Sequence, residues 1–178
     1  MRIILAAVDQ SRHAHNVVSR AAELASLLRT DLTILSVIDP DPMKTLSRSE
    51  EQNRLTIYQR ELIFKHFPRD GIVLESSDAN GTVYRYTAAG IRIRLTISQG
   101  NPVERICAIA DDLKADLVIV GNRGLGGVGG LVLGSVSERV VHKCSRSVMV
   151  VKDVGLPDKP TWESVLDLNQ PRQSLKAG

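Results

Sequence analysis

The chain is poor in aromatic residues: phenylalanine, tryptophan and tyrosine together make up 3% of its 178 residues. This scarcity argues against a surface on which nucleic-acid bases stack. The 23 lysines and arginines are spread along the chain without a dense run, and the net charge is only +3. Electrostatic support for nucleic-acid binding is therefore weak, and we do not expect nucleic acid as a partner.

Cysteine is also scarce, with only Cys107 and Cys144 in the chain. Neither belongs to a CxxC pair or to a Cys/His ligand spacing, so we expect no metal site and interpret both as small core residues in helices. The histidines are scattered, and we expect them on the solvated surface. They are His13, His15, His66 and His142.

Long apolar runs are absent as well. No run approaches the length needed to span a membrane, and the short apolar stretch after Met1 reaches Asp9 without the form of a signal peptide. We therefore expect a cytoplasmic protein with no membrane partner. With 43% apolar residues, a chain of this length can bury one full core but hardly two.

Strand and helix patterns alternate along most of the chain, which is typical of a parallel sheet with crossover helices. The five predicted strands span residues 3–8, 32–38, 91–97, 117–120 and 148–151. Ser49 is the predicted cap of a helix over about 50–66, and Asn101 of a helix with Pro102 in its first turn. Apolar and polar residues alternate strictly in 91–97, so we interpret this strand as a solvated edge of the sheet.

Two segments do not follow this alternation of strands and helices. At about 70–88, two strand patterns flank the pair Asn80-Gly81, a strong turn signal, and predict an inserted β-hairpin. The segment 154–178 holds three prolines and few clustered apolar residues. We interpret it as a tail that is flexible or packed on a partner subunit, following a nucleotide-binding domain over 1–153.

The strongest functional signal is the segment Gly121-Asn122-Arg123-Gly124, followed by nine residues and then Gly134-Ser135. It follows a buried strand pattern and leads into a helical pattern that begins near Leu131. Glycines let the backbone approach an anion closely, and the first N–H groups of a helix favour negative charge. We therefore expect a phosphate group, and hence a nucleotide, at this loop.

Three other interpretations of the glycine loop are weaker. Residues 124–129 satisfy the dinucleotide pattern GxGxxG, but they begin past the strand end and Asp153 lies later than the ribose-binding acid should. The spacing from Gly129 to Ser135 resembles a P-loop, but the obligatory lysine is replaced by Ser135. A plain strand-to-helix turn needs far fewer glycines than this loop contains.

The glycine spacing resembles the ATP-binding signature of the universal stress proteins. Further segments agree with that family: Val8-Asp9-Gln10-Ser11 after the first strand, Ser36-Val37-Ile38-Asp39 at the end of the second, and Gly100-Asn101-Pro102 before a helix. The likeness covers roughly 1–69 and 87–153. It implies a doubly wound α/β fold whose five-stranded parallel sheet has the order 3-2-1-4-5 and helices on both faces.

The same resemblance implies a nucleotide site. Asp9 would bind the ribose and Val37 the adenine through its backbone, while the remaining residues would surround the phosphates of ATP, with Mg²⁺ possible through those phosphates. The implied phosphate-binding residues are Gly121, Asn122, Arg123, Gly124, Gly134, Ser135, Val136 and Ser137. From the residues alone, Asp9 could instead cap a helix, Val37 could be core, and Arg123 could be a solvated cation.

The predicted function is that of an ATP-binding regulatory or stress-response protein. No catalytic residue is assigned, because nothing in the sequence resembles a complete hydrolytic constellation. The alternatives are an adenine-nucleotide hydrolase with slow ATPase activity and a module that binds AMP or cyclic AMP. The resemblance also implies a homodimer formed through the last strand, Val148 to Val151, which is short, uncharged and strongly β-prone.

Overall fold

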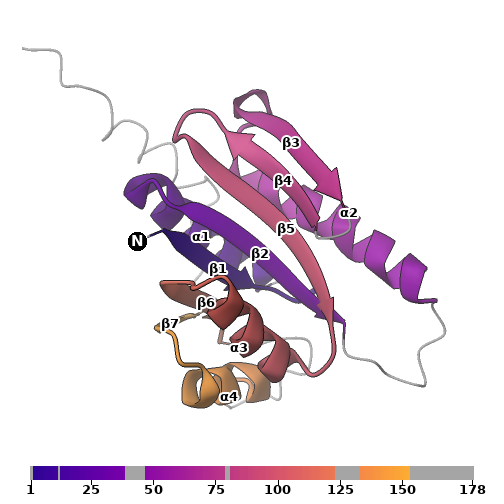
Figure 1. Cartoon of the computed structure of the whole chain (residues 1–178), viewed down its shortest axis with the longest axis vertical. Coiled ribbons are helices and arrows are strands. Elements are labelled where there is room, and N and C mark those ends of the chain that lie inside the picture. Colours follow the sequence, from indigo (N-terminus) through magenta and orange to yellow (C-terminus); the bar gives the residue numbers. More distant parts are fainter. Residues whose placement is uncertain (1, 12, 39–46, 79–80, 123–132, 153–178) are drawn as a thin grey trace, which may run out of the picture.

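The computed structural model describes residues 2–11, 13–38, 47–78, 81–122 and 133–152. Strands and helices alternate as the sequence predicts, with one antiparallel hairpin between them (Figure 1). The strands are β1 (Ile3–Ala7), β2 (Asp31–Ile38), β3 (Ile72–Asp78), β4 (Gly81–Tyr86), β5 (Ile91–Gln99), β6 (Leu117–Gly121) and β7 (Val148–Val151). The helices are α1 (Ala14–Leu28), α2 (Arg48–His66), a 3₁₀ turn (Arg69–Gly71), α3 (Pro102–Asp112) and α4 (Ser135–Lys143).

These strands form one seven-stranded sheet with the order β3-β4-β5-β2-β1-β6-β7. The prediction of a five-stranded, all-parallel sheet is wrong, because the hairpin of β3 and β4 joins the same sheet. β4 pairs antiparallel with both β3 and β5, whereas β5, β2, β1, β6 and β7 run parallel to one another. The sheet is therefore mixed, and its first edge is β3.

The strand of Ile91 to Ile97 is not an edge, as the sequence analysis expected, because β5 lies between β2 and β4. Its alternation has another cause. Ile91, Ile93 and Leu95 are buried beneath α2, whereas Arg92 on the opposite side is exposed. Alternating polarity indicates that one face of a strand is exposed to water. It does not indicate an edge, because an internal strand also has one exposed face where helices cover only the other face of the sheet.

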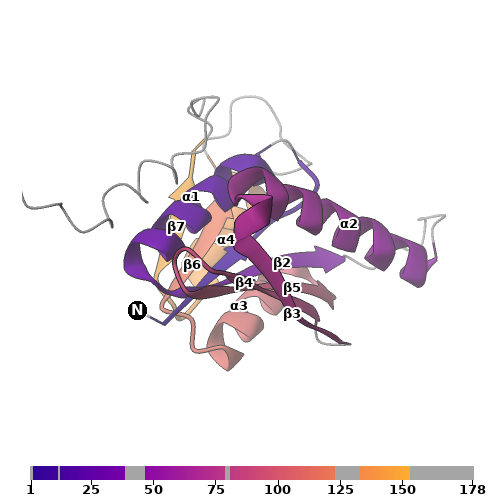
Figure 2. The same cartoon turned by 90° about the horizontal axis from the view of Figure 1, so that it is seen from above.

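Two apolar layers hold the helices against the sheet. Ile4, Ala6, Ile34 and Ile119 point into one layer with the buried residues of α1 and α2, whereas Leu5, Leu35, Val118 and Val120 point into the other with α3 and α4. Figure 2 shows α1 and α2 above the sheet and α3 below it. This alternation along the central strands, with both faces buried, is the pattern of a doubly wound sheet.

Helix ends follow local capping chemistry. The predicted cap of α2, Ser49, is wrong by two residues: Ser47 is the N-cap, and it forms a capping box with Glu50. The predicted cap of α3 is confirmed, since the Asn101 side chain accepts hydrogen bonds from the amides of Val103 and Glu104 at 3.1 and 3.3 Å. α4 begins at Ser135, and Gly134 is its N-cap.

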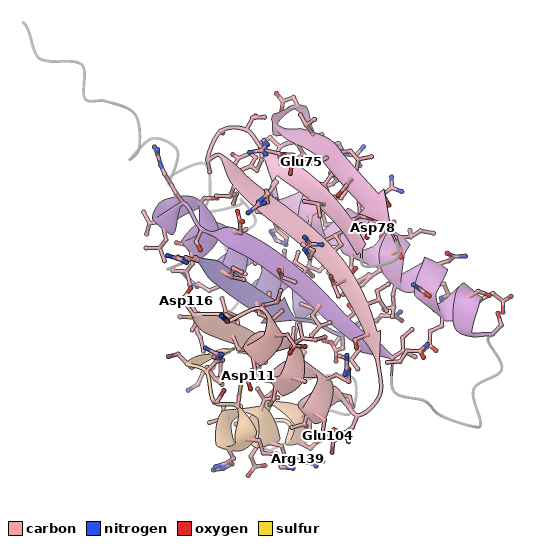
Figure 3. The ribbon with its side chains drawn as sticks, viewed as in Figure 1. Glu75, Asp78, Glu104, Asp111, Asp116 and Arg139 are labelled. Carbon is pink, nitrogen blue, oxygen red and sulfur yellow. The ribbon has the colours of Figure 1, made fainter. Side chains whose placement is uncertain are left out.

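The face of β3, β4 and β5 that points away from α2 carries paired charges. The Arg92 side chain on β5 lies 2.6 Å from Asp31 of β2, and Arg85 of β4 pairs with Glu75 of β3. Figure 3 shows Glu75 and Asp78 on β3 at this side of the sheet. Arg85 and Arg92 are directly opposite in register, so the two carboxylates offset a repulsion between like charges.

Candidate functional site

The register of the central strands brings the separate sequence motifs to one edge. Ala7 of β1 is aligned with Leu35 of β2 on one side and with Val120 of β6 on the other. Two residues further along each chain stand Asp9, Val37 and Asn122. The three predicted segments therefore end side by side at the carboxyl ends of parallel strands, where doubly wound sheets bind ligands.

β2 continues past the end of its neighbour at this edge. Leu35 is the last residue of β2 that is aligned with β1, and the amide of Val8 still donates to the Leu35 carbonyl at 2.8 Å. Val37 remains paired with Ser98 of β5, while its side chain packs on the apolar layer beneath α3. On the other side of β2, no residue of β1 is aligned with Val37, because the pairing of these two strands ends at Leu35.

The first turn of α4 is fixed to the end of β6. The amide of Gly134 donates to the carbonyl of Asn122 at 2.7 Å, and the buried Ser137 hydroxyl donates to the carbonyl of Gly121 at 2.5 Å. The amide of Asn122 donates to Val151 of β7 at 2.8 Å. The two ends of the glycine loop are thus held together by hydrogen bonds, which places the start of α4 at the same edge of the sheet as Asp9 and Val37.

The start of α4 has the character of an anion site. No side chain of the described residues caps this helix, because its N-cap is Gly134. The first amides of a helix have no partner within it, and they carry the positive end of its dipole. Ser135 and Val136 are both exposed here. The Asn122 side-chain oxygen is buried and makes no hydrogen bond within the described part of the chain.

Asp9 lies in the turn after β1, at the same edge of the sheet. One of its oxygens accepts a hydrogen bond from the Ser11 amide at 3.0 Å, so the carboxylate orders the turn after β1. It does not cap α1, whose N-cap is His13. The Tyr58 hydroxyl on α2 donates to the Ser11 carbonyl at 3.2 Å. Burial, together with the negative charge of Asp9, raises the pKa of Tyr58 to about 12.

Gln59 is a positioning residue that the sequence analysis did not single out. Its side chain is 1% exposed, and its amide group donates to the Ser36 hydroxyl at 3.1 Å and to the Thr96 carbonyl at 3.0 Å. These contacts attach α2 to the carboxyl ends of β2 and β5, next to Val37. The sequence holds one signal for this role: Gln59 is a polar residue on the apolar side of a predicted helix. A buried side-chain amide needs hydrogen-bond partners, so such a residue is expected to bind neighbouring elements.

A groove opens beside Asp9, on the exposed side of α2. Its volume is ≈ 380 Å³, and its lining residues are Gln10, Arg54, Ile57, Tyr58 and Glu61. None of the predicted nucleotide-binding residues that the structure describes lines it. The groove adds an aromatic ring, an aliphatic side chain and charges of both signs to the neighbourhood of the Asp9 turn.

The structure therefore brings together Asp9, Val37, Gly121, Asn122, Gly134, Ser135, Val136 and Ser137 at one edge of the sheet. Arg123 and Gly124, the other two predicted phosphate-binding residues, lie outside the described residues. So do the segment 124–129 of the dinucleotide pattern, the tip of the predicted hairpin turn at 79–80, and the predicted tail 154–178.

Comparison with known proteins identifies the family. The family model described as "Universal stress protein family" matches residues 1–152. The chain belongs to the universal stress protein family. A putative universal stress protein of Staphylococcus aureus strain USA300 is 32% identical over 158 residues, which cover 86% of each chain. A universal stress protein of Synechocystis is 27% identical over 150 residues, which cover 84% of this chain and 85% of the relative.

Solved structures agree with this family membership. A universal stress protein crystallised in complex with cAMP is 25% identical, with a TM-score of 0.58 and coverage of 85% of this chain and 96% of the other. The hypothetical protein MJ0577 is 26% identical, with a TM-score of 0.61 and coverage of 85% and 95%. A universal stress protein of Archaeoglobus fulgidus in complex with dAMP, 20% identical, shares the fold with a TM-score of 0.56 over 85% and 98%.

Within the described residues, no helix of this universal stress protein combines the length and the apolar content that a membrane-spanning helix requires.

Proposed function

We propose that this universal stress protein binds an adenine nucleotide, ATP in the first place, at the carboxyl ends of β1, β2 and β6, and that occupancy regulates its interactions with partners. The observation that carries the proposal is the alignment of Asp9, Val37 and Asn122 at one sheet edge, with the first turn of α4 bonded to the end of β6. The universal stress protein crystallised with cAMP supports an adenine nucleotide as the ligand class.

Each part of a nucleotide has a matching group at this edge. The uncapped amides of α4 and the Ser135 hydroxyl suit a phosphate. The carboxylate of Asp9 suits the ribose hydroxyl groups. The backbone of Val37, with which no residue of β1 is aligned, suits the hydrogen-bonding edge of adenine. The buried side-chain oxygen of Asn122, which makes no hydrogen bond within the described residues, suits a hydrogen-bond donor of the nucleotide. Arg123 and Gly124 are retained as phosphate contacts in the proposal, with Mg²⁺ bound through the phosphates.

Calorimetric titration with ATP and Mg²⁺ tests the proposal directly. The double variant Gly134→Val with Ser135→Ala is expected to lose ATP binding by at least tenfold, because valine fills the approach to the α4 amides and alanine removes a donor. The backbone of Gly134 has φ −74° and ψ 152°, which valine adopts without strain. Ser76→Ala, an exposed serine on β3, is the matched control and is expected to bind as the parent does.

A folded double variant that retains the parent affinity would contradict the assignment of α4 as the phosphate site. The same titrations with ADP, AMP and cAMP test the second candidate, a module for nucleoside monophosphates, which the cAMP complex of the similar protein favours. Equal affinity for AMP and ATP would support that module. A time course of ADP release from bound ATP tests the remaining alternative, slow hydrolysis.

A further inference from the structure

The two cysteines of the chain meet in the folded protein. Cys107 is on α3, and Cys144 is the C-cap residue of α4, so 36 residues separate them in sequence. Both side chains pack on the same apolar layer beneath the sheet, both are partly exposed, and both are free thiols. The two thiols are close enough for Cys144 to raise the pKa of Cys107, after burial, which is the larger cause. The sequence analysis interpreted them as unrelated core residues because neither spacing nor a motif connects them.

Neighbouring contacts hold the two thiols at this position. Asp111 lies one turn after Cys107 on α3, and its carboxylate accepts hydrogen bonds from the Ser145 hydroxyl at 2.5 Å and from the Arg146 guanidinium at 2.8 Å. Ser145 directly follows Cys144, whose own amide donates to Val140 at 2.9 Å. Figure 3 shows Asp111 on the side of α3 that faces α4. The backbone that follows each cysteine is therefore joined across α3 and the end of α4.

We propose that Cys107 and Cys144 are a disulfide-forming modification site, which small-molecule disulfides such as oxidised glutathione convert reversibly into an intramolecular bridge between α3 and α4. A bridge needs Cα atoms about 4.4–6.8 Å apart. The hydrogen bond between Asp111, one turn after Cys107, and Ser145, next to Cys144, puts the two cysteines on the sides of α3 and α4 that meet.

The chemistry balances with two molecules of glutathione released per bridge. The Cys144 thiolate attacks one sulfur of oxidised glutathione, the glutathione S–S bond breaks, and the first glutathione leaves and takes up a proton. The Cys107 thiolate then attacks the Cys144 sulfur and displaces the second glutathione, which takes up the other proton. The protein loses two electrons and two protons, and the small-molecule disulfide gains them.

The environment of Cys107 determines the order of these steps. Burial, followed by the charge and hydrogen bond of Cys144, raises the pKa of the Cys107 thiol to about 11. At neutral pH Cys107 is therefore a protonated thiol and a poor first nucleophile. Once Cys144 carries glutathione, it holds a disulfide sulfur next to Cys107, so the second step is a reaction within one molecule. Bridge formation is expected to accelerate as the pH rises.

The bridge would close a ring that contains β6 and α4. These elements carry Gly121, Asn122 and the residues from Gly134 to Ser137, which form the proposed phosphate side of the nucleotide site. The bridge would join the C-terminal end of α4 to α3. It would restrict the conformations of the unfolded chain more than those of the folded protein. The oxidised protein is expected to melt about 5–10 °C above the reduced one at equal pH.

The test equilibrates the native, full-length protein with reduced and oxidised glutathione, blocks free thiols with N-ethylmaleimide and maps the peptides by mass spectrometry without reduction. We expect most molecules to be monomers lighter than the reduced chain by two hydrogen atoms, with the Cys107 and Cys144 peptides joined. Dithiothreitol should restore the reduced mass and the lower melting temperature. This readout uses the parent protein alone and needs no variant to fold.

The single variants separate the roles of the two thiols. Cys107→Ser is expected to accumulate glutathione on Cys144, whereas Cys144→Ser is expected to leave Cys107 mostly unmodified at pH 7. The proposal is overturned if the native parent protein accumulates glutathione adducts without a bridge, if the bridge joins two chains, or if the intramolecular bridge forms only in denaturant.

Discussion

At the scale of single residues, two histidines lie at the contact between α1 and the end of α2. Nδ1 of His15 is 3.4 Å from Nε2 of His66, and the ring centroids are 5.7 Å apart. Burial, followed by the charges of His15 and Lys65, lowers the pKa of His66 to about 4. Burial and Lys65 also lower the pKa of His15. The pair is therefore neutral near pH 7, with one ring donating to the other.

This pair makes stability dependent on pH in the acidic range. The pKa of His66 in the folded state lies below its usual value of about 6.5 in an unfolded chain, so the unfolded chain binds more protons between those values. The contribution to stability is complete above about pH 6.5 and is lost as the pH falls toward 4, by at most roughly 3 kcal/mol. Denaturant unfolding measured at several pH values is expected to follow this profile.

A variant isolates the contribution of the pair. His66→Gln keeps a hydrogen-bonding side chain that does not titrate, so its unfolding free energy is expected to fall less steeply between pH 6.5 and 4. The matched control is His142→Gln, which removes an exposed histidine near the end of α4. If His66→Gln retains the steep profile of the parent, the pH dependence comes from other groups.

The histidines also correct an expectation from the sequence. His13 is buried, and His15 and His66 are only partly exposed, whereas the sequence analysis placed all four histidines on the solvated surface. The contact between His15 and His66 joins residues 51 positions apart. Such a contact follows from how α1 and α2 pack on the sheet, and hydrophobic periodicity within either helix carries no information about it.

At the scale of secondary-structure elements, the β3–β4 hairpin depends on close backbone contact with β5. Gly81 begins β4 with φ +131°, and a Cβ atom there would lie 2.1 Å from the carbonyl oxygen of Leu95. No side chain fits at that distance. The Asn80-Gly81 signal predicted the hairpin, but the need for glycine at this position also comes from the neighbouring strand.

Gly81→Ala is expected to lower the free energy of unfolding by about 2 kcal/mol or more, because it combines an unfavourable φ with a clash against fixed backbone. The matched control is Gly90→Ala. Gly90 has φ +68°, but an added Cβ meets nothing within 4 Å, so the expected loss is only about 1 kcal/mol. Denaturant titration compares the two. Equal losses would show that strain in φ, rather than contact with β5, governs both.

At the scale of the whole molecule, the sheet ends in two different edges. β3 forms one edge, with a register shift between Leu74 and Ser76, and β7 forms the other. Irregularities of this kind oppose pairing between sheet edges. The carbonyls of Ser147 and Val151 accept hydrogen bonds from the strand beside β7. The alternate residues, Val148 and Val150, therefore direct their backbone groups to the open edge.

We predict a homodimer in which β7 pairs with β7 of a second chain. Val150→Pro removes an outward N–H group and is expected to convert the dimer to a monomer, measured by size-exclusion chromatography with light scattering. Val73→Lys, which places a charge on the opposite edge strand β3, is expected to leave the dimer intact. Loss of the dimer in Val73→Lys alone would move the interface to β3.

What the sequence by itself determined is the set of elements and the motifs at their ends. Strand runs, the Asn101 cap, the hairpin turn and the glycine segment are local signals, because backbone conformation and capping depend on residues a few positions apart. The order of the parallel strands and a shared site for Asp9 and Gly121 were expected through a family resemblance, and the register of β1 with β6 supplies the geometry.

Only the tertiary structure decided where the hairpin joins the sheet, that Gln59 attaches α2 beside Val37, and that Cys107 meets Cys144. The physical reason is common to all three. Each depends on which element packs against which, and for Gln59 and the cysteines also on the rotation of a helix about its own axis. A local pattern shows that a residue is buried or half-buried, but the partner that buries it is chosen by the whole fold.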